Sequence, residues 1–541
     1  MKLRALVPVL LIGCVVQAQQ RAPNIESITK EELRADLTFL ASDAMQGRLT
    51  DTVTNAVAAE FVASRFQRLG LTPAGPKGSY FQPYNLMTAS LGAANALAIS
   101  GGPTARSGQD FYAARFSATG SAKGGVVFAG FGITWPEHGY DDYRGDVKDK
   151  IVLVVDHEPG ERDPASPFDG LVTSEASGPL RKALAAQDKG AAGILFVSDV
   201  HNHPEDANFE ASARTYWPAA PPRIERFTLA TWMERVKIPA AQISPAFAAQ
   251  ILAPSGRKLE DLSKASETAK GAVPIPLPGV EVELTTAVER HVIPDRNVLA
   301  LVEGSDPKLR DETVIVCAHY DHDGADGPRI FNGADDNGSG TIGLLEIAQA
   351  YALSAKAGQR PKRSVLLAAW NSEERGLLGA WAYTEDPMRP LDRTVGVLNM
   401  DMIGRNEEVP EGQGNTGRFR GLDVQTAESN ANATNVIGTT RSPSLLAVIE
   451  RANASIGLTL RLRYDNNISQ LMRRSDHWPF LNRGIPGVWF HSGLHPDYHT
   501  INDDADRINY EKMEKISRLV YQASWDLAQQ TARPTLTDGS R

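Results

Sequence analysis

Imidazole and carboxylate side chains follow a series of short apolar runs in the second half of the chain. They are, in order, His319, Asp321, Asp335, Asp336, Glu373, Glu374, Asp401 and His499. These two kinds of ligand suit zinc. Two imidazoles and three carboxylates can serve two metal ions when one carboxylate bridges them, and such ions clamp a shared water. One further carboxylate must stay unligated to take the proton from that water.

The adjacent residues Glu373 and Glu374 supply a candidate for that further carboxylate. Taken alone, the pair would be a solvated turn, because acidic residues are usually exposed. Two neighbouring carboxylates also repel each other unless positive charge lies nearby. A lone His or Asp after a strand is likewise more often a turn residue. The set as a whole favours a metal site, with Glu373 as the unligated carboxylate.

The elements that must position these residues alternate between strand and helix from about residue 280. Strands are predicted at residues 282–285, 298–302, 314–317, 365–370, 395–400 and 487–490, and helices at 339–355, 444–456 and 510–530. This alternation predicts an α/β fold with a mostly parallel mixed sheet and helices on both faces. Such sheets place their chemistry at the carboxyl ends of the strands.

The first half of the chain has a different pattern of predicted helices and strands. Residues 27–70 predict helices with Gly70 as a cap, and residues 73–83 predict a loop. Short strands at 96–99, 125–128, 151–155 and 193–197 surround a helix at 180–189. Prolines at 274, 276 and 278 mark a boundary. The predicted division is a signal peptide (1–18), N-terminal helices of the main domain (19–94), an inserted β-rich domain (95–278) and the rest of the main domain (279–535).

Five motifs follow one another in the order of a known family. They are Ala318-His-Tyr-Asp, Gly333-Ala-Asp-Asp-Asn-Gly-Ser-Gly, Ser372-Glu-Glu-Arg-Gly-Leu-Leu-Gly, Asn399-Met-Asp and Tyr498-His-Thr. With residues 20–94 and 280–530, they resemble the co-catalytic di-zinc aminopeptidases of peptidase family 28. That family includes bacterial leucyl aminopeptidases and, more distantly, glutamate carboxypeptidase and the transferrin receptor. The resemblance implies a zinc exopeptidase fold and two zinc ions per chain.

The resemblance also implies which side chains hold the zinc ions. His319 and Asp401 would bind one ion, and Glu374 and His499 would bind the other. Asp336 would bridge the two ions. A one-residue slip to Asp335 would exchange the bridging ligand for its neighbour.

Three further residues receive roles from the same resemblance. Asp321 would accept a hydrogen bond from the imidazole of His319 and fix its tautomer. Glu373 would be the general base and then the general acid to the leaving amine. Tyr498 would stabilise the oxyanion of the tetrahedral transition state.

The inserted segment, residues 95–278, resembles a protease-associated domain. The likeness rests on residues 150–155, 182–190 and 192–197, which are mainly glycine and apolar residues. Domains of this kind often cover a peptidase cleft and shape substrate access.

The expected function is an exported zinc-dependent exopeptidase, specifically an aminopeptidase acting on peptides. A carboxypeptidase of the same family would use the same metals, and an arginine-lined pocket would favour it. A glutaminyl cyclase relative would bind one zinc. A non-enzymatic, receptor-like relative would have lost ligands, whereas all five candidate ligands are present here.

The N-terminus and the overall composition limit location and partners. Lys2 and Arg4 precede an apolar run and Ala18, which predicts a signal peptide cleaved before Gln19 and a periplasmic or secreted protein. The alternative is a lipobox, in which Cys14 would carry a lipid anchor. No membrane span is expected. With a net charge of −9, a nucleic-acid footprint is not expected. The composition does not predict an oligomeric state.

Several other residues have the right chemistry but are interpreted as structural or outer residues. His201 and His203 are expected to lie in a loop with no matching cluster. The segment 475–477, Ser-Asp-His, is expected to line the cleft, because consecutive positions do not supply a serine triad. Cys317 has no disulfide partner outside the signal peptide and is expected to be buried and inert. Outer positions near the site are expected for His322, His491 and His495.

Overall fold

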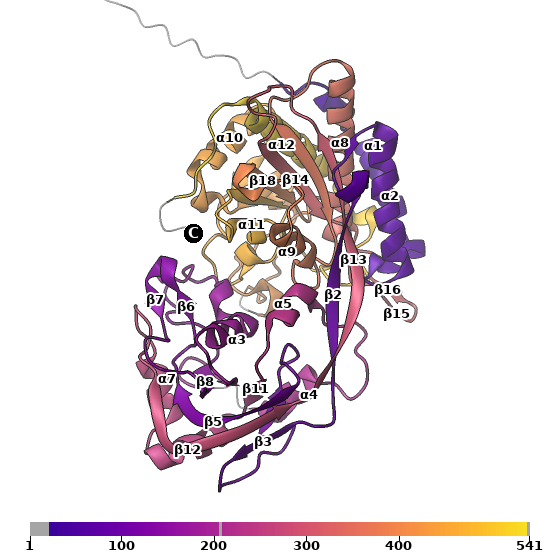
Figure 1. Ribbon diagram of the computed structural model, residues 1–541. Coiled ribbons are helices and arrows are strands. Elements are labelled where there is room, and N and C mark those ends of the chain that lie inside the picture. Colours follow the sequence, from indigo (N-terminus) through magenta and orange to yellow (C-terminus); the bar gives the residue numbers. More distant parts are fainter. Residues whose placement is uncertain (1–20, 205–207, 415, 538–541) are drawn as a thin grey trace, which may run out of the picture.

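The computed structural model describes residues 21–204, 208–414 and 416–537. It has two lobes, each built on its own sheet (Figure 1). The predicted signal peptide and Cys14 lie outside the described residues, so their role stays a prediction. Within the described ranges, no helix is both long and apolar enough to cross a membrane.

The main lobe contains a ten-stranded mixed sheet. Its strand order is β10 (Thr228–Leu229), β2 (Phe81–Leu91), β13 (Val288–Val302), β17 (Ser364–Trp370), β14 (Thr313–His319), β18 (Thr394–Met400), β21 (Gly487–His491), β19 (Ala433–Ile437) and β20 (Thr459–Arg461), and β1 (Thr72–Pro73) pairs with β13. The central strands β17, β14, β18 and β21 are parallel. The outer pairs β2–β13, β13–β17 and β19–β21 are antiparallel. The predicted α/β fold with a mixed sheet is confirmed.

Helices cover both faces of this sheet, as the sequence predicted. On β14, Val314 and Val316 point into one core, whereas Ile315 and Cys317 point into another. The first core is shared with α1 (Lys30–Leu40), α2 (Val53–Leu69), α8 (Gly340–Lys356), α10 (Pro443–Asn453) and α12 (Tyr510–Gln529). The second is shared with α9 (Leu378–Glu385) and α11 (Trp478–Leu481). Continuous apolar runs on the central strands follow from this two-sided burial.

The smaller lobe contains a seven-stranded sheet. Its order is β3 (Ala96–Ile99), β12 (Ile275–Thr286), β5 (Gly120–Phe128), β8 (Ile151–Val155), β9 (Gly193–Val197), β11 (Ala240–Ile243) and β4 (Phe111–Ala113). Its helices are α3 (Pro179–Asp188), α4 (Phe209–Tyr216), α5 (Ala230–Arg235), α6 (Pro245–Leu252) and α7 (Leu259–Ala265). A short hairpin, β6 (Thr134–Trp135) with β7 (Tyr140–Asp141), also belongs to this lobe. A second hairpin, β15 (Ala325–Asp326) with β16 (Arg329–Ile330), lies in the main lobe, where β16 contacts the turn Asp43–Arg48.

Two strands depart from the sequence-based expectations. The boundary predicted at residue 278 falls inside β12, which pairs with β3 and β5 of the smaller lobe. A shift in register between Pro276 and Glu281 accommodates the prolines, since proline is tolerated in strands at bulges. Strand β2 begins at Phe81, inside the predicted loop, and pairs with β13 along its whole length. Together β2 and β13 run from the main sheet toward the smaller lobe (Figure 1).

A loop of the smaller lobe, residues 156–178 between β8 and α3, contacts the main lobe. The backbone N–H of Leu171 donates to Asn466 and that of Thr173 donates to Gln470, each at 2.8 Å. Glu175 accepts from the indole of Trp478 at 2.9 Å and from Arg473 at 3.1 Å. The loop therefore supports main-lobe residues 466–478.

Candidate metal centre

Neighbouring parallel strands deliver the predicted ligands to one edge of the main sheet. His319 is the last residue of β14, and Asp401 follows β18 directly. Glu374 lies four residues beyond the end of β17. Asp336 lies in a π-helical turn, Ala334–Ser339, that leads into α8. His499 lies in the loop between β21 and α12. We call these five residues the peptidase cluster, after the family that their motifs resemble.

The carboxylate of Asp336 lies between the two imidazoles of the peptidase cluster. Its Oδ1 is 3.5 Å from His319 Nε2, and its Oδ2 is 2.9 Å from His499 Nε2. Asp401 Oδ1 lies 3.5 Å from the same nitrogen of His319. Glu374 Oε2 lies 3.2 Å from that of His499. The structure thus brings together all five predicted ligands, with Asp336 in the central position.

The donor atoms of this cluster fit a pair of divalent metal ions. Three groups of potential ligands meet here: His319 with Asp336 and Asp401, His322 with Asp336 and Glu374, and Asp323 with Glu374 and His499. Among the described residues, His319 Nε2, His499 Nε2 and Asp401 Oδ1 are buried without a hydrogen-bond partner. Buried polar atoms are normally satisfied, so these atoms are available as ligands.

Asp321 and Asp323 contact the Nδ1 atoms of the two imidazoles, whereas the Nε2 atoms face the other ligands. Nδ1 of His319 lies 3.3 Å from the backbone carbonyl of Asp321 and 3.6 Å from its carboxylate. That carboxylate also accepts from the backbone N–H of Glu373 at 3.0 Å. Nδ1 of His499 lies 3.1 Å from Asp323, which Arg375 holds at 2.6 Å. Asp323 was not singled out in the sequence, although its position four residues after His319 places it beside Asp321.

Ser475 and Asp503 contact the cluster from distant parts of the chain. The hydroxyl of Ser475 donates to Asp401 Oδ2 at 2.6 Å and accepts from Asn399 at 2.6 Å. Asp503 accepts from the backbone N–H of Asp336 at 3.1 Å. Ser475 was predicted only to line the cleft, and no local signal in the sequence indicates Asp503.

Glu373 and Tyr498 face a cavity of about 300 Å³ beside the cluster, which Arg473, Arg474 and Leu471 also line. A carboxylate oxygen of Glu373 lies 3.6 Å from His319 Nε2. Burial, opposed by His319 and reinforced by Asp401, raises the pKa of Glu373 well above its usual value. Burial also raises the pKa of Tyr498, so its phenol remains a hydrogen-bond donor. The cavity thus offers a carboxyl group that can hold a proton and a neutral O–H.

Three residues at the ligand-bearing turns adopt left-handed backbone conformations. Ser372, which precedes Glu373, has φ 57°, Met402 has φ 58°, and His499 has φ 54°. Such conformations cost about 1–3 kcal/mol each for residues other than glycine. Met402 and His499 line the cavity, and Ser372 precedes Glu373, which also lines it, so the surrounding fold must stabilise these turns.

The neighbouring candidates take other positions. The carboxylate of Asp335 accepts from the backbone N–H of Gly404 at 2.6 Å, and His495 lies 3.4 Å from it. His322 Nδ1 lies 2.7 Å from Glu374, and His491 Nδ1 lies 3.2 Å from the carbonyl of Asp401. His322 and His491 therefore contact the ligands Glu374 and Asp401, whereas His495 contacts Asp335.

The segment 475–477 does not form a serine triad. Ser475 is bonded to Asp401 and Asn399, as described above. His477 is buried, and neither of its ring nitrogens has a hydrogen-bond partner in the described ranges. Burial lowers the pKa of His477 to about 3, which keeps its imidazole neutral. Cys317 is buried within β14, as predicted.

The chain is similar to several known peptidases. Residues 297–524 match the profile of peptidase family M28. A protein of Arabidopsis thaliana described as probable glutamate carboxypeptidase AMP1 is 28% identical over 407 residues, which make up 72% of this chain and 51% of that protein. Aminopeptidase NAALADL1 of Mus musculus is 35% identical over 127 residues, or 23% of this chain and 16% of that protein. The chain spans about half or less of the length of these curated relatives.

Among solved structures, the aminopeptidase from Aneurinibacillus sp. strain AM-1 aligns with a TM-score of 0.48. The two are 18% identical, and the alignment covers 94% of this chain and 95% of that one. Every residue of the peptidase cluster lies within the stretch that matches the family profile. The chain therefore carries a domain of peptidase family M28 over residues 297–524.

Proposed function

We propose that the protein is a zinc-dependent exopeptidase that releases N-terminal residues from peptides. One observation carries the proposal: the two oxygens of Asp336 face two different imidazoles, and each imidazole has a second carboxylate beside it. A bridging carboxylate between two such pairs suits two metal ions with a shared water. The family profile and the mouse relative described as an aminopeptidase support the same activity.

In this proposal, His319 and Asp401 hold one zinc, Glu374 and His499 hold the other, and Asp336 bridges them. Zinc bound there supplies Lewis-acid activation of water and of the scissile carbonyl. Asp321 and Asp323 hold the imidazoles in the tautomers that leave Nε2 free for metal. Ser475 holds Asp401 in the same way, through a hydrogen bond to the carboxylate oxygen that does not face His319.

Glu373 is the proposed proton carrier. It lines the cavity beside the cluster, and its raised pKa, caused mainly by burial, suits a group that receives a proton and then returns it to the leaving amine. Tyr498 lines the same cavity. Its O–H would donate to the oxyanion that develops on the carbonyl, where a preorganised donor acts chiefly in the transition state.

A carboxypeptidase activity is the second candidate, and Arg474 is the observation that favours it. This side chain is half-buried and lines the cavity. No hydrogen bond or ion pair to its guanidinium is found in the described part of the chain, whereas Arg473 beside it is bound to Glu175. A free guanidinium there could bind a substrate carboxylate. The plant relative described as a probable glutamate carboxypeptidase agrees with this alternative.

The test compares blocked and free peptide ends on one purified sample whose zinc content is measured. We expect aminoacyl-p-nitroanilides to be hydrolysed and N-acetylated peptides to be resistant. Equal cleavage of free and acetylated N-termini would contradict the aminopeptidase assignment, and resistance of C-terminally amidated peptides would favour the carboxypeptidase.

A variant separates the proposed chemistry from metal binding. Glu373→Ala should lose hydrolysis while keeping its zinc, because Glu373 is not a proposed ligand. Glu411→Ala, at an exposed site, is the control. Full activity of zinc-loaded Glu373→Ala would disprove the proposed proton transfer.

We also propose that the protein is exported, on the basis of residues 2–18 alone. Mass spectrometry of the N-terminus in the producing organism should find cleavage before Gln19. A lipid-modified Cys14 would support the lipobox alternative, and an intact Met1 would contradict both.

A further inference from the structure

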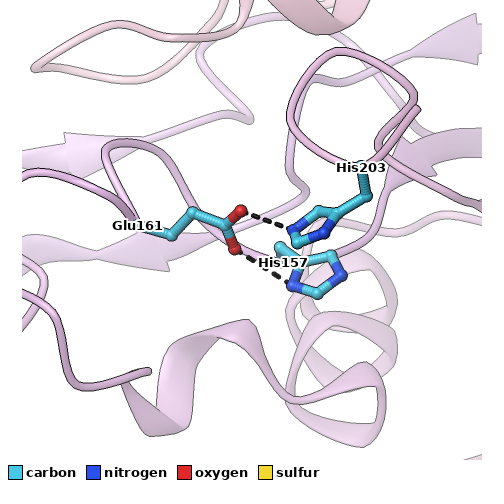
Figure 2. Close-up of side chains that lie close together, drawn as sticks. All are labelled: His157, Glu161 and His203. Carbon is cyan, nitrogen blue, oxygen red and sulfur yellow. Dashed lines mark ion pairs between the residues drawn. The ribbon is translucent and has the colours of Figure 1, made fainter. Parts of the chain in front are cut away.

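A second cluster of histidine and carboxylate lies in the smaller lobe, away from the peptidase cluster. It consists of His157 and Glu161, in the loop after β8, and His203, in the loop after β9; we call it the smaller-lobe cluster (Figure 2). The sequence prediction that His203 has no matching cluster is wrong. The prediction failed because β8 and β9 are parallel neighbours, so their carboxyl ends bring together residues more than forty positions apart in sequence.

The carboxylate of Glu161 lies between the two imidazoles. Its Oε2 is 3.1 Å from His157 Nδ1, and its Oε1 is 2.5 Å from His203 Nε2. The rings stack with centroids 4.1 Å apart, and Figure 2 shows both turning a nitrogen toward the carboxylate. His203 Nε2 and Glu161 Oε1 are buried atoms, yet the contact between them lacks the angles of a hydrogen bond.

We propose that His157, Glu161 and His203 bind a zinc ion that joins the loops after β8 and β9. One nitrogen from each imidazole and a carboxylate oxygen lie within 4.8 Å of one another. Two imidazoles and one carboxylate form a ligand set found at three-ligand zinc sites, which keep a fourth position for water. Calcium and magnesium prefer oxygen ligands throughout, so the two imidazoles select against them.

Hydrogen bonds to neighbouring residues fix the backbones of the two loops that carry the smaller-lobe cluster. Glu267 accepts from the backbone N–H of Gly160 at 2.8 Å and from the side chain of Asn202 at 2.7 Å, so it links the residues next to Glu161 and His203. The backbone N–H of His203 donates to the carbonyl of Asp199 at 2.8 Å. The ammonium of Lys182 donates to the carbonyl of His157 at 2.6 Å. The ligand backbones are thus fixed independently of the ligands themselves.

A zinc ion at this position would act on the peptidase cavity through structure rather than chemistry. The loop that carries His157 and Glu161 continues to Glu175, which contacts Arg473 and Trp478 of the main lobe. Arg473 lines the cavity beside the peptidase cluster. Zinc would fasten the start of this loop, and the far end of the loop supports one wall of the cavity.

Zinc counting in two backgrounds tests the proposal independently of the proposed activity. The Asp336→Asn variant should lose the zinc of the peptidase cluster and retain one equivalent per chain. Adding His203→Ala to it should remove that equivalent, whereas His201→Ala, in the same loop, should not. Added zinc should raise the Tm of Asp336→Asn and leave that of the double variant unchanged.

Glu161→Gln keeps the shape of the side chain and serves as a second probe if His203→Ala folds poorly, which circular dichroism will report. It should also lose the retained equivalent. The proposal is overturned if Asp336→Asn protein binds no zinc, or if the His203 and Glu161 variants bind as much as the His201 control. In that case the cluster is a carboxylate shared by two imidazoles. Loss of hydrolysis alone would bear on the peptidase cluster and not on this one.

Discussion

The peptidase cluster and the smaller-lobe cluster occupy equivalent places in two unrelated sheets. Each lies beyond the carboxyl ends of neighbouring parallel strands, β14, β17 and β18 in one case and β8 and β9 in the other. In each, a carboxylate lies between two imidazoles, Asp336 in the first and Glu161 in the second. Parallel strands thus gather ligands at one edge in both lobes.

The clusters differ in charge and burial. Around His319 and His499 lie six carboxylates, from Asp321, Asp323, Asp336, Glu373, Glu374 and Asp401. His319 has no exposed side-chain surface, whereas the side chain of His157 is 36% exposed; the second imidazoles, of His499 and His203, are alike at 30% and 29%. An excess of buried negative charge requires compensating cations, but one carboxylate facing two imidazoles is nearly balanced by itself. On the proposals above, the peptidase cluster would depend on metal for its charge balance, whereas metal at the smaller-lobe cluster would add a crosslink.

Replacing the bridging carboxylate should have the largest effect. Asp336→Asn removes the shared negative charge, so we expect both zinc ions of the peptidase cluster to be lost. Hydrolysis should fall by at least ~10³-fold, equivalent to about 4 kcal/mol of transition-state stabilisation. Inductively coupled plasma mass spectrometry and kcat/KM measure the two effects. Asp392→Asn, at an exposed position, is the control, and retention of both zinc ions by Asp336→Asn would show that Asp336 is not the bridge.

Removing the phenol at the cavity should have a smaller effect that leaves the metals in place. Tyr498→Phe should lower kcat by about 100-fold, the typical cost of one oxyanion donor, with little change in KM. In the control, Tyr80→Phe, the lost hydroxyl donates to the carbonyl of Leu71 in the N-terminal part of the main lobe. An unchanged kcat in zinc-loaded Tyr498→Phe would exclude the phenol from the reaction.

The guanidinium of Arg474, for which the described residues supply no hydrogen bond or ion pair, should affect substrate choice. Arg474→Gln should raise KM by about tenfold for substrates that place a carboxylate near the cavity, since hydrogen bonds to charged groups contribute about 1.5–3 kcal/mol. Neutral aminoacyl substrates should be affected less, and Arg420→Gln, at an exposed site, should change neither. An equal change in KM for charged and neutral substrates would mean that Arg474 supports the cavity without binding the substrate.

Local patterns were enough to predict five of the ten strands of the main sheet, β13, β14, β17, β18 and β21, whereas the roles of the ligands rested on the resemblance to a family. His319, Glu374 and Asp401 each come at or just after the end of a continuous apolar strand. The strand that positions each residue can therefore be recognised in the sequence next to it. The strands predicted at 151–155 and 193–197 coincide with β8 and β9. Buried parallel strands are short, apolar and bounded by turns, which makes them visible without tertiary information.

Contacts made only in the folded chain were not predictable in this way. Ser475 reaches Asp401 across 74 positions, and His203 reaches Glu161 from the next strand of its sheet. Neither residue lies in a pattern that distinguishes it from an ordinary turn. The prolines near residue 276 indicated a boundary because proline usually interrupts strands, whereas a shift in register lets β12 continue through them.

The smallest effect should come from loosening the contact through which the smaller lobe supports the cavity. Glu175 accepts hydrogen bonds from Trp478 and Arg473 across the two lobes. In Glu175→Gln, the amide oxygen can still accept from the indole and the guanidinium, but the negative charge that pairs with Arg473 is lost. A net loss of about 1 kcal/mol corresponds to a roughly fivefold rise in KM, with kcat and zinc content unchanged. Glu137→Gln is a matched control, because Glu137 also accepts from an indole, that of Trp135, but within one lobe.

If zinc in the smaller-lobe cluster fixes the same loop, His203→Ala should also raise KM. The variant with both substitutions should then raise KM by less than the product of the two single effects. Independent effects would mean that the two ends of the loop act separately, and a fall in kcat would mean that the smaller lobe influences the chemistry itself.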